Sequence, residues 1–199
     1  MKRRKLNTSD SGRDIVDKGT GSDNKVKHAG KVRKGSFEHR FERRRYLNQL
    51  VDELQTTKSM EAKQQVAANL ANFAYDPYNY HFFQEIGVIP LFLAELSVNR
   101  DQTLVEFSMA GICNCAGDNR IHKEILRNDG LSIIKRHAYS SSDSIVLSCI
   151  TTLITLLNVD VELKDGILKD DFYARLLQLT ESLDNRVKNV SHILLEDLR

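Results

Sequence analysis

The chain has 199 residues, of which 41% are apolar and 28% are charged, so it is long enough for one folded domain and a tail. Two prolines, ten glycines and the near absence of alternating apolar and polar residues disfavour sheet-rich folds and predict an all-helical domain. The net charge of +2 hides an asymmetry: residues 1–45 hold 15 basic and 6 acidic side chains (+9), whereas residues 46–199 hold 14 and 21 (−7).

The three cysteines, Cys113, Cys115 and Cys149, are odd in number and lie in helical patterns. This argues against a disulfide framework and favours a reducing compartment. The basic N-terminus has no apolar run behind it, which argues against a secretory signal. No apolar stretch approaches the roughly 18 residues of a membrane span, so we expect no membrane association.

Residues 1–36 form a basic arm with few apolar side chains, which predicts disorder, and residues 37–199 form the domain. The arm begins with a basic cluster, Lys2, Arg3, Arg4 and Lys5, which is typical of a nuclear-import signal or a nucleic-acid contact. A solvated tail without one dedicated partner is an equal alternative.

Aromatic residues alternate with arginines just after the arm, in residues 37–46. Arg43, Arg44 and Arg45 are therefore candidate nucleic-acid contacts, with the aromatic rings stacking on bases. The alternative, which we favour, is the first part of a helix whose aromatic side chains dock on the domain. An apolar stripe continues this helix to about Lys58.

Residues 65–76 predict an amphipathic helix, with Val66 and Leu70 on one face and polar or small residues on the other. Ser59 is the expected N-cap, and Pro77 is expected to end the helix. A short helix follows and ends at Gly87, and a third helix then carries a proline in its first turn.

This pattern recurs with a period of 41–43 residues. Residues 68–74 align with 110–116 and 151–157, and the short helix ending at Gly87 aligns, with a shift of 43, on one ending at Gly130. A period near 42 with three helices is typical of armadillo and HEAT repeats, which need about three stacked units for stability.

A polar face recurs on the long helix of each unit and is expected to line the concave side of the superhelix. Asparagine can pair with a peptide backbone through both its carbonyl and its amide group, so this face predicts a partner-binding surface. Alternatively, Asn72 and Asn114 satisfy neighbouring loop carbonyls. The candidate partner-binding residues are Gln65, Asn69, Asn72, Asp76, Phe107, Asn114, Thr151 and Thr155.

These units resemble armadillo repeats, which carry an asparagine late in the third helix of each unit to hold extended peptides. Asn72 and Asn114 match that position, and Thr155 departs from it. The resemblance implies a short right-handed armadillo-type superhelix of about three repeats. Import adaptors of the family carry a tryptophan four residues earlier, and this chain has none, which argues against an import-cargo receptor.

The string Asn72-Phe73-Ala74-Tyr75-Asp76-Pro77 most closely resembles a small armadillo-repeat family associated with the minor spliceosome. That resemblance implies a nuclear, non-enzymatic protein-binding scaffold in pre-mRNA splicing. It further implies an RRM-type RNA-binding partner, with spliceosomal proteins and small nuclear RNA as the wider context. The alternative is a direct RNA-binding module that uses the basic arm, against which the acidic domain argues.

No motif indicates an enzyme. Cys113 and Cys115 are too close in sequence for a zinc pair, the six histidines are scattered, and glycine-rich phosphate loops are absent. We therefore expect no catalytic residues, metal, cofactor or small-molecule substrate.

Overall fold

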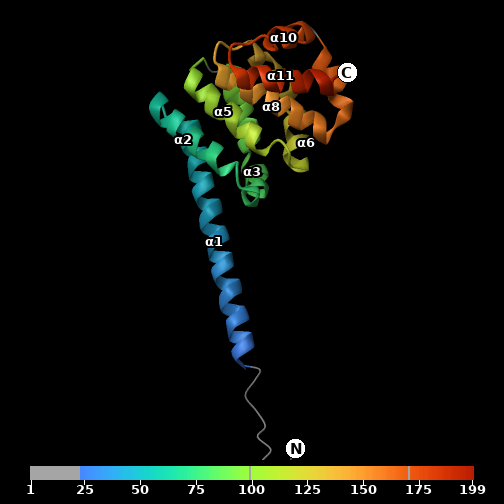
Figure 1. Cartoon of the computed structure of the whole chain (residues 1–199). Coiled ribbons are helices and arrows are strands. Elements are labelled where there is room, and N and C mark those ends of the chain that lie inside the picture. The colour runs from blue at the N-terminus through green and yellow to red at the C-terminus, as the bar shows by residue number, and fades with distance from the viewer. Residues whose placement is uncertain (1–22, 99, 170) are drawn as a thin grey trace, which may run out of the picture. The chain divides into compact units, whose positions relative to one another are not determined.

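The computed structural model describes residues 23–98, 100–169 and 171–199, with side chains from Arg40 onward (Figure 1). All regular elements in these ranges are helical and none is a strand, which confirms the all-helical prediction. By its contacts the chain divides into two compact units, Met1–Glu42 and Arg43–Arg199.

Helix α1, Asp23–Thr56, includes residues 23–36 of the predicted basic arm. Residues 1–22, with the basic cluster, lie outside the described residues, so the disorder of the arm and the domain boundary at residue 37 stay predictions. In the Arg43–Arg199 unit, the predicted apolar stripe of α1 is buried in the hydrophobic core, and this burial holds the C-terminal part of α1 on the unit. The members of this stripe are Leu47, Leu50, Val51 and Leu54.

Helix α2, Met60–Phe73, begins where the sequence predicts, because the Ser59 hydroxyl accepts a hydrogen bond from the backbone N–H of Ala62. It ends at Phe73, three residues before the predicted end. Asp76 instead caps a 3₁₀ turn, Pro77–Asn79, by accepting a hydrogen bond from the N–H of Tyr78 at 3.0 Å.

Three sets of two shorter helices and a longer one follow α2, in agreement with the expected number of repeats. The first is α3 (Tyr80–Ile86), α4 (Val88–Val98) and α5 (Gln102–Cys115). The second is α6 (Asn119–Arg127), α7 (Gly130–Arg136), a 3₁₀ turn at His137–Tyr139, and α8 (Asp143–Val159). The third is a 3₁₀ turn at Val161–Leu163, then α9 (Lys164–Leu168), α10 (Phe172–Leu179) and α11 (Asn185–Asp197).

Gly87 has φ 74°, a left-handed conformation that suits the predicted helix end. In the second repeat the left-handed residue is Asp129, with φ 55°, so the prediction that Gly130 plays this role is wrong. Gly130 instead begins α7, where an added Cβ would lie 2.5 Å from the carbonyl oxygen of Ile125. The structural period between these repeats is therefore 42 residues rather than 43.

The long helices pack in chain order, α2 on α5, α5 on α8 and α8 on α11 (Figure 1). They share one continuous apolar core with the shorter helices, as expected for a solenoid in which each repeat covers the next. Gly111 on α5 permits a close approach of α4, because an added Cβ would lie 2.4 Å from the ring of buried Phe92.

No single helix in the described ranges is long and apolar enough to cross a membrane. The bent pair Pro77–Ile86 and Val88–Val98 reaches the required length and composition only when taken together. Phe83, Val88, Ile89 and Phe92 of this pair are fully buried in the core.

Candidate protein-binding surface

A stripe of polar side chains runs along the outer face of α2. At 100° per residue, Gln65, Asn69 and Asn72 fall within a narrow sector opposite the buried face, and Asp76 follows beyond the end of the helix. Gln65, Asn72 and Asp76 are exposed, and Asn69 is half-buried. The sequence therefore places these four candidates correctly on one accessible face, although their binding role stays a prediction.

The corresponding positions on the next two long helices are less accessible. Phe107 and Asn114 on α5 and Thr151 and Thr155 on α8 are all half-buried. Phe107 packs against the core, and the Thr155 hydroxyl donates to the carbonyl oxygen of Thr151 at 2.9 Å. The predicted stripe is thus most open on α2 and is partly used for internal contacts on α5 and α8.

Asn114 makes a hydrogen bond to a backbone carbonyl within the domain, which is close to the structural alternative that the sequence left open for this residue. Its side-chain nitrogen donates to the carbonyl oxygen of Ala71 at 3.1 Å, near the end of α2. The hydroxyl of Tyr80 donates to the backbone carbonyl of Asn114 at 3.2 Å. These bonds tie α5 to α2 and α3, whereas the side chain of Asn72 is exposed.

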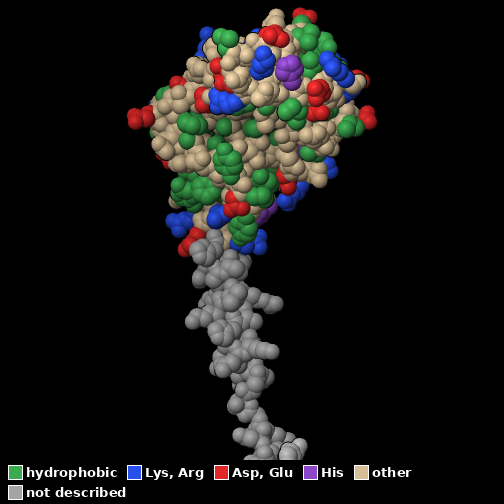
Figure 2. Space-filling view, viewed as in Figure 1, with side chains coloured by type: hydrophobic (Ala, Val, Ile, Leu, Met, Phe, Trp, Pro, Cys, Tyr) green, Lys and Arg blue, Asp and Glu red, His purple; other side chains and the backbone are tan. Residues whose placement is uncertain are grey.

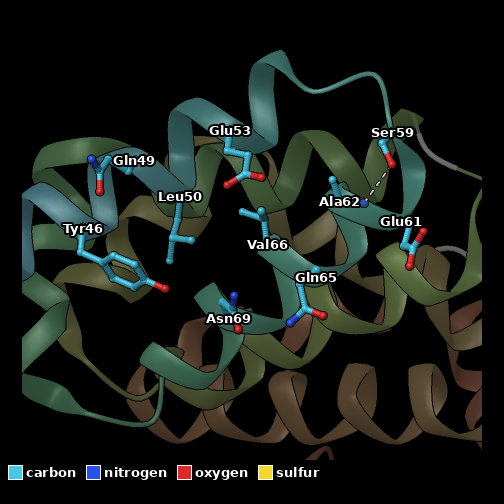
Figure 3. Close-up of a pocket in the computed structure, with 10 residues that line it drawn as sticks. All are labelled: Tyr46, Gln49, Leu50, Glu53, Ser59, Glu61, Ala62, Gln65, Val66 and Asn69. Atoms are coloured by element: carbon cyan, nitrogen blue, oxygen red, sulfur yellow. Dashed lines mark hydrogen bonds between the residues drawn. The ribbon is translucent and has the colours of Figure 1, made fainter.

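A groove of about 700 Å³ lies between the C-terminal part of α1 and α2 (Figure 3). Figure 3 shows side chains of both helices around this space, with Tyr46 at one end and Glu61 at the other. Among the described residues, its lining contains two carboxylates, three amides and no lysine or arginine. The lining residues are Tyr46, Gln49, Leu50, Glu53, Ser59, Glu61, Ala62, Gln65, Val66 and Asn69.

Gln65 and Asn69 are the predicted partner-binding residues that this groove contains. The sequence did not identify Tyr46, Gln49, Glu53 or Glu61 as part of the surface. Their positions on a polar helix face were visible, but the groove exists only because α1 and α2 pack at a particular distance. The distance between the two helices cannot be predicted from the periodicity of apolar residues within either one.

Two of the three candidate nucleic-acid arginines at positions 43–45 make contacts within the domain. Arg43 forms an ion pair with Asp76 at 2.8 Å, donates to the side-chain oxygen of Asn79 at 3.2 Å, and lies over the ring of Tyr78. Arg44 is 3.4 Å from Glu85. These contacts favour the docking interpretation of residues 37–46, and Arg45 remains exposed.

The aromatic side chains of the same segment differ from one another. The ring of Tyr46 packs against that of Phe73, with centroids 5.7 Å apart, whereas Phe41 is exposed. Asp76 has a lowered pKa, because it accepts a hydrogen bond from the N–H of Tyr78 and faces the Arg43 guanidinium. Asp76, predicted as a partner contact, therefore already has partners in the domain.

All three cysteines are free thiols. Burial raises the pKa of Cys115 and of Cys149, and each thiol donates to a backbone carbonyl, of Gly111 and of Ile134 respectively. Within the described ranges, no group of three or more His, Cys, Asp and Glu side chains is placed to hold a metal ion.

The chain matches no family model. It is 36% identical over 152 residues to armadillo repeat-containing protein 7 of Mus musculus, and the match covers 76% of each protein. The chain belongs to the armadillo repeat-containing protein 7 family. The match therefore confirms the resemblance that the string at residues 72–77 suggested.

Solved armadillo structures confirm the fold of this family member. It superposes on computationally designed armadillo repeat proteins for modular peptide recognition with a TM-score of 0.70 at 18% identity. A designed armadillo repeat protein in complex with the peptide (KR)4 gives a TM-score of 0.69 at 17% identity. Each match covers 77% of this chain and 64% of the designed one, so this chain spans slightly less than two thirds of either.

Proposed function

We propose that the chain is a protein-binding scaffold that holds an extended segment of its partner along α2. The observation that carries this proposal is the accessible stripe of Gln65, Asn69 and Asn72, of which Gln65 and Asn69 line the groove of about 700 Å³. Amides of this kind can donate to and accept from a peptide backbone, which lets them bind an extended chain without a sequence-specific pocket.

The chemistry of the groove indicates which partner segment fits it. Glu53 and Glu61 line the groove, and none of its described lining residues is cationic, so a segment with lysine or arginine is favoured by charge. The structurally similar designed protein that holds a (KR)4 peptide supports a basic ligand for this fold. Tyr46 adds an aromatic face on which a cationic side chain can rest.

The wider role that we propose is that of a minor-spliceosome component in the nucleus, acting in pre-mRNA splicing through an RRM-type protein. Membership of the armadillo repeat-containing protein 7 family supports this role, through the resemblance at residues 72–77. Spliceosomal proteins and small nuclear RNA form the expected context. No catalytic function is part of the proposal.

A pull-down of the full chain from nuclear extract tests both parts of the proposal. The test variant is Gln65→Ala, Asn69→Ala, Asn72→Ala, which removes the stripe beside the groove. The matched control removes the same residue types at exposed positions elsewhere: Gln55→Ala, Asn119→Ala, Asn158→Ala.

Recovery of an RRM protein and minor-spliceosome RNA by the wild type and the control, but not by the test variant, is the expected result. Equal recovery by all three would keep the spliceosomal role and contradict the α2 surface. Absence of an RRM protein from all three would contradict that partner. RNA retained in that case, and lost when Lys2, Arg3, Arg4 and Lys5 are changed to glutamine, would favour direct RNA binding by the basic arm.

A further inference from the structure

Two cavities, of about 300 and 350 Å³, open at the end of α7, the first against Phe172 of α10 and the second against the starts of α5 and α8. They share Arg136 and Tyr139 and therefore adjoin one another on the Arg43–Arg199 unit. The first is lined by Ser132, Lys135, Arg136, Tyr139 and Phe172. The second is lined by Arg100, Gln102, Val105, Arg136, His137, Tyr139, Ser140, Ser141 and Ile145.

We call Arg100, Arg136 and Tyr139 the arginine edge. Both arginines are exposed, and neither forms an ion pair within the described ranges. The described residues that line the two cavities include no carboxylate. Asp101 adjoins Arg100 in sequence, but its carboxylate accepts from the N–H of Leu104 and from the amide of Gln64.

Further cations at this region are fixed by the fold. The Arg175 guanidinium lies 5.5 Å from the ring centroid of Tyr139, and its Nε donates to the carbonyl oxygen of Ala138 at 2.9 Å. Lys135 donates to the carbonyl oxygens of Gly166 and Lys169, both at 3.0 Å. These charged side chains are held in place before any ligand binds, so binding does not have to include the entropy cost of ordering them.

Tyr139 provides an aromatic surface among these charges. Tyr139 is 56% exposed, lines both cavities together with Arg136, and has the Arg175 guanidinium over its ring. His137 is not counted among the cations, because burial lowers its pKa and its Nε2 contacts the carbonyl oxygen of Leu96 at 3.1 Å. The edge therefore combines exposed cations, hydroxyls and an aromatic ring that is partly exposed.

We propose that the arginine edge binds single-stranded RNA, with Arg100 and Arg136 on phosphates and a base stacked on Tyr139. Alternation of cations with an exposed aromatic ring is how proteins hold single strands, whereas an acidic peptide would need the charges alone. The net charge of −7 on residues 46–199 does not prevent this, because charges more than about 8–10 Å away are screened at physiological salt.

The visible face of the Arg43–Arg199 unit in Figure 2 carries acidic and basic side chains side by side, so its charge varies locally. This RNA site goes beyond the protein-binding role proposed above and does not depend on it. It is also separate in sequence from Lys2, Arg3, Arg4 and Lys5, the nucleic-acid candidates of the basic arm.

The test measures binding of a fluorescein-labelled oligouridylate of ten nucleotides by fluorescence anisotropy, over a range of salt concentrations. The full chain is used with Lys2, Arg3, Arg4 and Lys5 changed to glutamine, so that the basic cluster of the arm does not mask the edge. Arg100→Gln, Arg136→Gln is compared with Lys123→Gln, Arg127→Gln, which removes two exposed cations from α6.

The edge variant is expected to weaken binding about tenfold and to reduce the slope of log affinity against log salt by about 1.4, which corresponds to two phosphate contacts on a single strand. The α6 control is expected to keep the slope. An unchanged slope and affinity in the edge variant, or equal losses in both variants, would overturn the proposal.

A second measurement tests stacking. Tyr139→Ala is expected to weaken binding about tenfold, Tyr139→Phe to retain it, and Tyr75→Ala, at another exposed tyrosine, to leave it unchanged. Circular dichroism confirms that each variant is folded. If an oligoglutamate or phosphoserine peptide displaces the RNA and binds Tyr139→Ala as well as wild type, the edge is a site for acidic protein segments and the RNA proposal is wrong.

Discussion

Asn72 on α2 and Asn114 on α5 occupy equivalent positions 42 residues apart, yet their side chains have different surroundings. Asn114 donates to Ala71 on the preceding long helix, whereas Asn72 is exposed. In a solenoid each repeat contacts its neighbours, and α2 is the first of the equivalent long helices, so Asn72 has no corresponding helix of an earlier repeat to bind. The end of the stack is therefore where a polar position is most available to a partner.

The first and second repeats also differ at a buried position, but here it is the earlier residue that is hydrogen-bonded. Tyr80 and His122 each lie four residues after a capping aspartate, Asp76 and Asp118. The Tyr80 hydroxyl reaches the carbonyl oxygen of Asn114, whereas both ring nitrogens of His122 are buried without a hydrogen bond. The two equivalent residues are therefore both buried, but only Tyr80 has a hydrogen-bond partner for its polar group among the described residues.

Core substitutions on α2 and α8 should have the largest effects and should not distinguish the two ends. Leu70 and Leu153 are both fully buried between stacked helices. Replacing either with alanine should lower the free energy of unfolding by about 2–5 kcal/mol, because each change leaves a cavity. Urea unfolding followed by circular dichroism measures this. A loss below about 1 kcal/mol for Leu70→Ala alone would show that α2 is loosely packed.

Asn114→Ala and Asn72→Ala test the comparison directly. Asn114→Ala should lower the free energy of unfolding by about 1 kcal/mol, because a half-buried hydrogen bond to Ala71 is lost. Asn72→Ala should change it by less than about 0.5 kcal/mol, as expected for an exposed side chain, while reducing partner recovery in the pull-down. Equal destabilisation by the two variants would contradict the difference between them.

The sequence predicted the features that depend on neighbours along the chain. Helical periodicity located α2 and its polar face, Ser59 was identified as its cap, and Gly87 as a left-handed helix end. The pairing of Arg43 with Asp76 joins residues 33 positions apart, and the α1–α2 groove depends on helix packing. Such contacts leave no periodic signal, so they could not be read from the sequence.

The register between repeats shows the same limit. Glycine marks the helix end at Gly87, so Gly130 was taken as its equivalent, but Asp129 has the left-handed conformation there. The glycine at 130 reflects instead the closeness of Ile125, a contact within the folded repeat. A residue type can thus recur for two different physical reasons one position apart.

His122 should make stability depend on pH. Burial lowers its pKa in the folded state, with Asp160 at 3.9 Å opposing part of this effect. Protonation therefore favours the unfolded chain, and stability present above pH 6.5 should fall as the pH drops below that value. His122→Phe should reduce the loss between pH 7.5 and 5.5 in urea unfolding. The matched change at exposed His192 should leave the loss as it is, and an equal effect of both variants would contradict the assignment to His122.

Arg43→Gln should have a small effect on stability, and it tests whether α1 is held at the end of the stack by charge. The Arg43 and Asp76 side chains are 37% and 50% exposed, so solvent screening limits their ion pair to about 0.5 kcal/mol. The loss should disappear in 1 M salt, and Arg45→Gln is the control.

Because the Asp76 pKa is lowered, the contribution of the Arg43–Asp76 ion pair to stability should be present at neutral pH and vanish as the carboxylate is protonated in acid. A loss well above 1 kcal/mol that persists in 1 M salt would instead indicate that the Arg43 side chain acts by packing on Tyr78.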